Sequence, residues 1–165
     1  MEIRIAGTVN DSIVDGPGIR FTIFVQGCSR HCPGCQNPQT WDPEGGDVTT
    51  TEALEEVIAA NKLLKGVTFS GGEPFEQAAP LIEIADWCHD RGLDVWSYSG
   101  YLYEELLAGK AGEDAAELLR RSDVLVDGPF IEAEKSYAAK WRGSTNQKVI
   151  DVQKSLESGE IVSYL

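Results

Sequence analysis

The sequence feature that most constrains the fold is a regular alternation of strand-like and helix-like segments after residue 19. The strand-like runs are short and rich in β-branched and aromatic residues, whereas the longer runs have helical periodicity. We expect strands over residues 19–26, 66–70, 93–98, 123–127 and 147–152. We expect helices over 75–91, in one or two short pieces between 101 and 121, and over 52–62 with a start near Thr49, which has capping-box spacing to Glu52. Strands that alternate with helices predict βαβ units and a mainly parallel sheet.

The length of the chain limits how many such units it can form. The chain has 165 residues, whereas a closed (β/α)8 barrel typically takes about 250. We therefore expect an α/β fold, an incomplete (β/α) barrel of about five or six mainly parallel strands with outer helices, built as a single domain over residues 1–165. Ligands of such sheets bind at the carboxyl ends of the strands. The loop 28–35, the turn 71–74, residues 97–100 and Asp127 all follow strands, so one crevice could hold them all.

The charge balance excludes one broad class of function. Lys and Arg total 14 against 27 Asp and Glu, for a formal net charge of −13, and no basic run exceeds two residues. Nucleic-acid binding needs a basic footprint, which this chain lacks. The chain also lacks an N-terminal signal-peptide pattern and any run of 18 apolar residues. We therefore expect a cytoplasmic protein with neither a nucleic-acid nor a membrane partner.

Three cysteines lie close together in the spacing Cys28-x3-Cys32-x2-Cys35. In a cytoplasmic protein this clustering points to metal or redox chemistry rather than to disulfides. Closely spaced thiolates select zinc or an iron–sulfur cluster. A closed zinc site would need a fourth ligand, and His31 and Cys88 are the only obvious candidates. His31 is awkwardly placed inside the loop.

The other candidate, Cys88, and the only other histidine, His89, lie in the helical segment 75–91. Cys88 is in helical register with Leu81 and Ile84, so we expect it in the core. His89 is expected on a polar helix face. The pattern therefore favours a [4Fe–4S] cluster held by three cysteines with one iron open, and a structural zinc loop remains the competing interpretation.

A second motif, Gly71-Gly72-Glu73-Pro74, follows a predicted strand directly. Glycines let the backbone approach a ligand closely. Alone, such a turn is weak evidence for a cofactor site. It becomes strong evidence here because it lies one strand–helix unit after the cysteine motif. Together the two motifs resemble the radical S-adenosylmethionine enzymes, which implies a [4Fe–4S] cluster on Cys28, Cys32 and Cys35.

The resemblance also implies how the cofactor binds. The amino and carboxylate groups of S-adenosylmethionine take the fourth iron position, and the Gly-Gly-Glu-Pro backbone meets the amino group. The residue before the third cysteine is often aromatic in that superfamily; here it is Gly34, so adenine contacts are expected largely through backbone. Glu73 belongs to the cofactor turn and is not expected to act as a general base. The residues placed at the cofactor are Gly34, Gln36, Asn37, Gly71, Gly72, Glu73 and Ser97.

Further motifs narrow the resemblance. Residues 15–21 (DGPGIRF), 24–28 and 37–42 resemble the glycyl-radical activating enzymes. Within that group, residues 32–35 (CPGC), 126–130 (VDGPF) and 141–147 (WRGSTNQ) most resemble the activating proteins of anaerobic (class III) ribonucleoside-triphosphate reductase, and the similarity spans about residues 7–151. Asp15 is then a candidate contact for the partner's glycine loop. Asp127, Arg142 and Asn146 receive no role.

The function that the resemblance implies is radical generation. A reduced cluster cleaves S-adenosylmethionine, and the 5′-deoxyadenosyl radical takes a hydrogen atom from a glycine of the reductase, so no acid–base pair is needed. The implied partners are the reductase and a flavodoxin- or ferredoxin-type electron donor. Three alternatives remain: an activase of another glycyl-radical enzyme such as pyruvate formate-lyase, a non-catalytic zinc-stabilised binding module, and a ferredoxin-like electron carrier.

Overall fold

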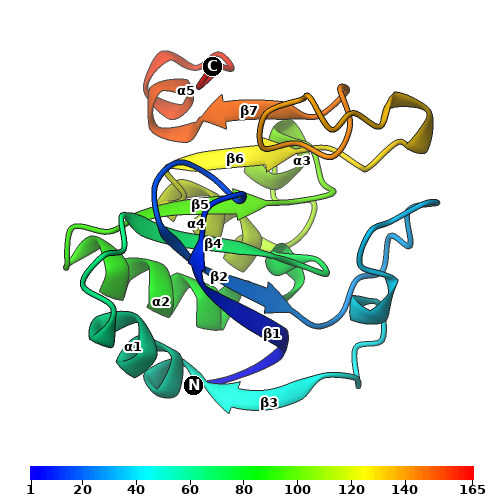
Figure 1. The fold of residues 1–165 in the computed structure, drawn as a ribbon. Helices are drawn as coiled ribbons and strands as arrows, with labels where there is room; N and C mark the ends of the chain where they lie inside the picture. The colour runs from blue at the N-terminus through cyan, green and yellow to red at the C-terminus, as the bar shows by residue number, and fades with distance from the viewer.

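A single seven-stranded sheet organises the computed structural model, which describes all residues 1–165 (Figure 1). The strand order is β3-β1-β2-β4-β5-β6-β7. The strands are β1 (Glu2–Ser12), β2 (Arg20–Val25), β3 (Asp47–Thr50), β4 (Gly66–Gly71), β5 (Asp94–Tyr98), β6 (Val124–Asp127) and β7 (Lys148–Asp151).

The centre of the sheet is parallel and its edges are antiparallel. Strands β2, β4, β5 and β6 run parallel to one another, whereas β1, β3 and β7 pair antiparallel. The expected α/β fold is confirmed, and all five expected strands are present. Strands β1 and β3 were not expected: most of their side chains are exposed, and the apolar alternation of β1 is limited to Ile3 and Ile5.

Helices cover one face of this sheet (Figure 1). The α-helices are α1 (Thr51–Ala60), α2 (Ala78–His89), α3 (Tyr103–Leu107), α4 (Glu113–Arg121) and α5 (Val152–Ser158). Three short 3₁₀ helices are η1 (Pro38–Thr40), η2 (Pro74–Gln77) and η3 (Glu132–Glu134). None of the helices has the length and hydropathy that a bilayer crossing requires.

The helix boundaries differ from the sequence prediction in three places. The cap of α1 is Thr50, one residue after the expected Thr49, and its hydroxyl accepts a hydrogen bond from Ala53 N (3.1 Å). The expected helix 75–91 is divided into η2 and α2. Helix α5 was not expected; Asp151 ends β7 and caps this helix.

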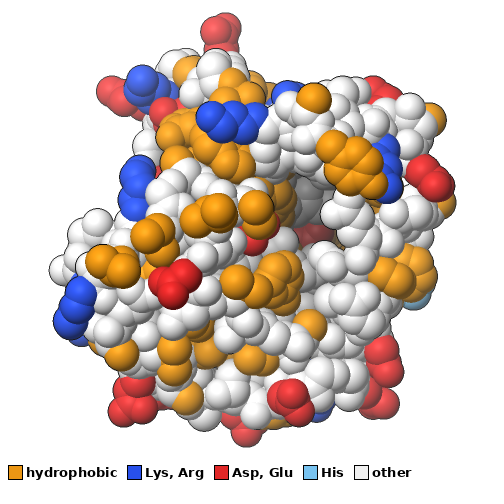
Figure 2. All heavy atoms as spheres, in the orientation of Figure 1, with side chains coloured by type: hydrophobic (Ala, Val, Ile, Leu, Met, Phe, Trp, Pro, Cys, Tyr) orange, Lys and Arg blue, Asp and Glu red, His pale blue; other side chains and the backbone are white.

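The two faces of the sheet have different side chains because successive residues of a strand point to opposite sides. Apolar residues such as Phe21, Ile23 and Phe69 pack under the helices in the main core. The alternate residues of β2 and β4, among them Thr22 and Ser70, point the other way. On that side the surface is hollowed next to the carboxyl ends of the parallel strands (Figure 2).

A buried guanidinium joins the three central strands on that side. Arg20 is fully buried; its Nε donates to Thr68 Oγ1 (2.8 Å), and its two Nη atoms donate to the carbonyls of Val67 (2.8 Å) and Pro17 (3.0 Å). It also forms an ion pair with Asp94 of β5.

This ion pair requires a glycine between its two partners. Gly66 of β4 lies between Arg20 and Asp94 in the sheet register. A Cβ at Gly66 would come within 2.2 Å of Asp94 Oδ1 and 2.8 Å of Arg20 Nη2. Only glycine therefore lets the guanidinium pass across β4 to the carboxylate.

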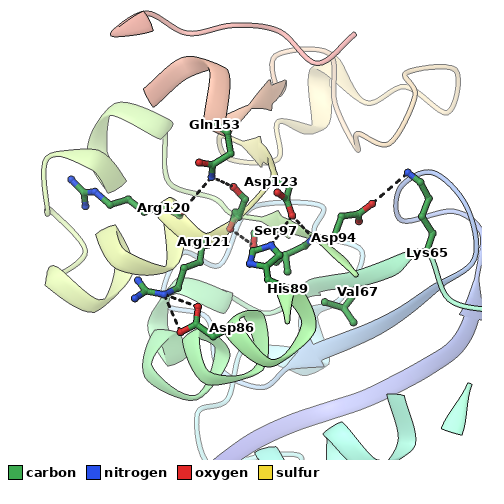
Figure 3. Close-up of polar contacts among 12 residues, drawn as sticks. Lys65, Val67, Asp86, His89, Asp94, Ser97, Arg120, Arg121, Asp123 and Gln153 are labelled. Carbon is green, nitrogen blue, oxygen red and sulfur yellow. Dashed lines mark hydrogen bonds and ion pairs between the residues drawn. The ribbon is translucent and has the colours of Figure 1, made fainter. Parts of the chain in front are cut away.

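Removal of Arg20 should destabilise the fold strongly. Arg20→Met removes the donor to Asp94 Oδ1, to the Thr68 hydroxyl and to two carbonyls, so we expect a loss of about 3 kcal/mol in the free energy of unfolding. Lys65 binds the same carboxylate from solvent (3.4 Å; Figure 3), so Lys65→Ala should cost less than about 1 kcal/mol. Urea unfolding of both variants measures the difference, and equal losses would show that the buried contacts are not what stabilises this region.

Candidate functional site

A cavity of about 780 Å³ opens at the carboxyl ends of the parallel strands. Each of the four strands continues directly into a loop that lines it. Strand β2 leads to Cys28, β4 to Gly72, β5 to Ser99 and β6 to Gly128. The parallel topology therefore brings together loops that are far apart in the sequence.

The cysteine loop is closed at its base by backbone hydrogen bonds. Gly27 N donates to the Thr40 carbonyl (2.6 Å) and Cys28 N to the Trp41 carbonyl (3.1 Å). Within the loop, Cys35 N donates to the Cys32 carbonyl (3.1 Å). These bonds hold the loop as an ordered turn at the end of β2.

The three loop cysteines are free, half-buried and part of the cavity lining. The backbone amide of Asn37 donates to Cys35 Sγ (3.4 Å). Burial raises the pKa of the Cys28 thiol, and a bound metal would replace that proton. Nowhere in the structure are three or more His, Cys, Asp or Glu side chains arranged to hold a single metal ion. Three soft sulfur donors at the wall of a cavity fit an iron–sulfur cluster.

The other possible nitrogen and sulfur ligands, Cys88, His31 and His89, make structural contacts instead. Cys88 is completely buried in the core, as predicted. His31 stacks on Trp41 with the ring centroids 4.5 Å apart. His89 lies on its helix face 2.9 Å from Asp123 at the opposite edge of the sheet, as predicted (Figure 3).

The glycine turn packs directly on the base of the cysteine loop. Gly72 N donates to the Val25 carbonyl (3.0 Å) and Glu73 N to the Gly27 carbonyl (2.8 Å). Gly71 has φ +106°, and a Cβ at Gly72 would lie 2.3 Å from the Gly27 carbonyl oxygen. Larger residues do not fit here, so the two sequence motifs form one structural unit.

Glu73 connects this unit to the next strand. Its side chain is buried, with Oε1 accepting from Gly100 N (2.7 Å) and Oε2 from the Ser99 hydroxyl (2.9 Å) and Phe75 N (3.2 Å). Burial raises the pKa of Glu73 to about 7, although these three hydrogen bonds favour the charged form. The carboxyl group is thus fully engaged in holding two turns together.

The structure does not place every expected residue at the cavity. Ser97 does not reach it: this side chain points to the helix face and bonds to the Ser122 hydroxyl (2.8 Å), because strand alternation turns Trp96 and Tyr98, not Ser97, to the other side. Ser99 occupies the position that we expected for Ser97. That signal was available in the sequence, because the alternation of β5 is readable from its apolar residues.

Among the other expected residues of the cysteine loop and of the first turn, three line the cavity and one does not. Gln36 and Asn37 line the cavity. Gly34 is outside the lining, and a Cβ there would lie 2.7 Å from the carboxyl carbon of Glu132. Asp15 lines the cavity, with Oδ2 accepting from the hydroxyls of two neighbouring residues, Ser12 and Thr22 (3.0 and 3.2 Å).

The structure shows the contacts of the three residues to which the sequence assigned no role. Asp127 is buried, accepts from Tyr103 N (2.8 Å) and Lys148 N (3.3 Å), and therefore holds chain segments together. Asn146 donates to the Pro129 carbonyl (2.8 Å). Arg142 lines the cavity, where its Nη1 donates to the Gln147 carbonyl (3.2 Å) and its buried Nε has no acceptor.

Titration of Glu73 should be visible in the stability of the protein. The folded state binds the Glu73 proton more tightly than the unfolded state, so wild-type stability is present at low pH and is lost as pH rises from about 4.5 to about 7. Relative to Glu73→Gln, the wild-type free energy of unfolding should fall by up to about 3 kcal/mol across that range. Urea unfolding of both proteins at several pH values checks this, and parallel curves would contradict it.

Comparisons with known proteins agree with this site. The model of a family described as a 4Fe-4S single cluster domain matches residues 14–150. The anaerobic ribonucleoside-triphosphate reductase-activating protein of Salmonella typhi is 36% identical over 145 residues, which cover 83% of this chain and 91% of that protein. The pyruvate formate-lyase-activating enzyme of Clostridium pasteurianum is 39% identical over 113 residues, covering 63% of this chain and 48% of that enzyme.

The fold has a relative among solved structures. The crystal structure of QueE from Escherichia coli matches with a TM-score of 0.53 and 15% identity, covering 77% of this chain and 71% of that chain. This likeness concerns the fold alone. The family model and the relatives show that the chain belongs to the 4Fe-4S single cluster domain family and to the anaerobic ribonucleoside-triphosphate reductase-activating proteins.

Proposed function

We propose that this chain, acting as one radical S-adenosylmethionine domain, cleaves S-adenosylmethionine reductively at a [4Fe–4S] cluster. The resulting 5′-deoxyadenosyl radical generates a glycyl radical on anaerobic ribonucleoside-triphosphate reductase. The observation that carries the proposal is the packing of the Gly71–Glu73 turn on the base of the cysteine loop, with both lining one cavity. A cluster and a cofactor bound to its open iron need such a shared wall.

The bound groups supply the one-electron and hydrogen-atom chemistry, and the protein supplies binding and orientation. Cys28, Cys32 and Cys35 would hold the cluster, and the backbone amide of Asn37 would donate to the sulfur of Cys35. The backbone of Gly71 and Gly72 would meet the methionine part of the cofactor.

The remaining side chains orient the other parts of the complex. Glu73 keeps the glycine turn in place through its bonds to Ser99 and Gly100. Gln36 and Asn37 are the candidates for adenine, since Gly34 lies outside the cavity lining. Asp15, at the cavity wall, is the candidate contact for the partner's glycine loop.

The choice of partner rests on how much of each relative is matched. The reductase-activating protein of Salmonella typhi is matched over 91% of its length, whereas the pyruvate formate-lyase-activating enzyme is matched over 48%. The reductase is therefore the favoured partner. The cluster would receive its electron from a flavodoxin- or ferredoxin-type donor.

Cluster assembly should depend on the three loop cysteines and not on the fourth. After anaerobic reconstitution with iron and sulfide, we expect about four irons per wild-type chain, and Cys28→Ser, Cys32→Ser and Cys35→Ser should each lose the cluster. Cys88→Ala is the matched control, because Cys88 is buried in the core, and it should keep the cluster. Iron analysis and absorption spectra measure this. About one zinc per chain and no cluster would support the binding-module alternative instead.

Activation of the reductase is the second test. The reconstituted protein, S-adenosylmethionine and dithionite should yield 5′-deoxyadenosine, and addition of anaerobic ribonucleoside-triphosphate reductase should give the doublet of a glycyl radical in electron paramagnetic resonance. The same assay with pyruvate formate-lyase is the control. A doublet with pyruvate formate-lyase alone would assign the chain to that partner, and absence of 5′-deoxyadenosine would refute the radical chemistry.

A further inference from the structure

Residues 131–147 form a short arm that folds back on itself. Lys135 and Ser144 form an isolated antiparallel bridge, Ser136 N donates to the Gly143 carbonyl (3.2 Å), and Thr145 N donates to the Glu134 carbonyl (2.9 Å). The arm follows β6 and projects on the same side as the cysteine loop, with a gap between the two (Figure 1). Residues of the arm, among them Ser136 and Tyr137, line the cavity, so the arm forms part of its rim.

The base of the arm is fixed by side-chain hydrogen bonds. Gln147 Oε1 accepts from Gly143 N (2.9 Å) and Ser144 N (3.2 Å), while Gln147 Nε2 donates to the Gly128 carbonyl (3.0 Å). One glutamine thus connects the returning half of the arm to the end of β6.

The middle of the arm is fixed by an aromatic residue. The Trp141 ring lies edge-on to Trp96 with the centroids 5.0 Å apart, and the Trp141 carbonyl accepts from the Tyr98 hydroxyl (2.7 Å). Trp141 has φ +59°, which for a bulky residue costs about 1–3 kcal/mol and persists only where the surroundings hold it. The contacts of Trp141 therefore hold the arm in place.

The tip of this held arm exposes an aromatic ring. Tyr137 is 88% exposed and lines the cavity. Lys135 Nζ lies 4.9 Å from the centroid of its ring, within cation–π range. Aromatic rings held out at a rim are typical of the residues that supply binding energy in protein interfaces.

The turn after β1 exposes apolar side chains at the same cavity. Ile13 and Val14 are 73% and 71% exposed, and Val14 lines the cavity together with Val9. Figure 2 shows hydrophobic side chains on both sides of the hollow. Strand β3 pairs only with Glu2–Ile5 of β1, so the later residues of β1 have an edge without a strand neighbour on that side.

We propose that Tyr137 of the arm and Val14 of the turn form a collar that grips the glycine-bearing segment of the reductase, an inference that rests on the function proposed above. Only an occupant that enters the cavity touches both parts of the collar, which belong to one lining. A small cofactor inside the cavity would leave the Tyr137 ring in water. Apolar side chains beside a free strand edge suit an extended, uncharged polypeptide segment.

The test compares three exposed residues. Tyr137→Ser and Val14→Ser should each weaken binding of the reductase by about tenfold or more, because each removes an apolar contact. Leu63→Ser is the matched control: Leu63 is 71% exposed, as Val14 is, but lies outside the cavity lining, and its variant should bind as wild type does. Affinity is measured on reconstituted proteins, and 5′-deoxyadenosine formation without reductase should be unchanged in all three.

The outcomes separate the collar from the proposed function. If wild type binds the reductase but forms no 5′-deoxyadenosine, the proposed function fails, and the affinities still decide the collar. If both collar variants bind within twofold of wild type, the collar is wrong, and it also falls if wild type binds no reductase. Loss of self-association, or a defect seen with a protein electron donor and absent with dithionite, would assign the surface to a second copy or to the donor and overturn the proposal.

Discussion

The buried guanidinium of Arg20 is the interaction on which the site depends. It donates to two residues of β4, pairs with Asp94 of β5, and binds the carbonyl of Pro17 in the turn that carries Asp15. These contacts fix β2, β4 and β5 side by side. Because the strands are parallel, their fixed register also fixes the loops at their carboxyl ends. A charge buried at one end of the sheet thus positions cysteines and glycines at the other.

At the carboxyl ends of the strands, close backbone packing holds the loops together. The glycine turn bonds to Val25 and Gly27 at the base of the cysteine loop, and Glu73 ties the same turn to Gly100. Burial of this carboxyl group is costly, as the raised pKa of Glu73 shows, and its three donors offset part of that cost. The cavity wall is consequently rigid before any ligand binds, which reduces the entropy that a cluster and cofactor would lose on binding.

Local patterns predicted the central strands and the main helices because β-branched runs and helical periodicity are local properties. They did not reveal β1 and β3, where the apolar alternation is limited to Ile3 and Ile5 and most side chains are exposed, and so the sheet has seven strands instead of five or six. The cap of α1 was placed one residue early because Thr49 and Thr50 are the same residue type, and residue type alone does not decide which of the two begins the helix. Ser97 was misplaced because we considered only its position at a strand end and not the face of its side chain.

The sequence by itself determined the chemistry that the chain offers: the spacing of three thiols, the glycines after a strand, and a net charge of −13. Residue type and short spacing are enough for such conclusions, since they concern which donors exist. Only the tertiary structure decided which residues share the cavity. Val14 and Tyr137 are more than 120 positions apart in the numbering, yet they line one cavity. Parallel strands bring distant loops to one edge, and no local pattern encodes which loop meets which.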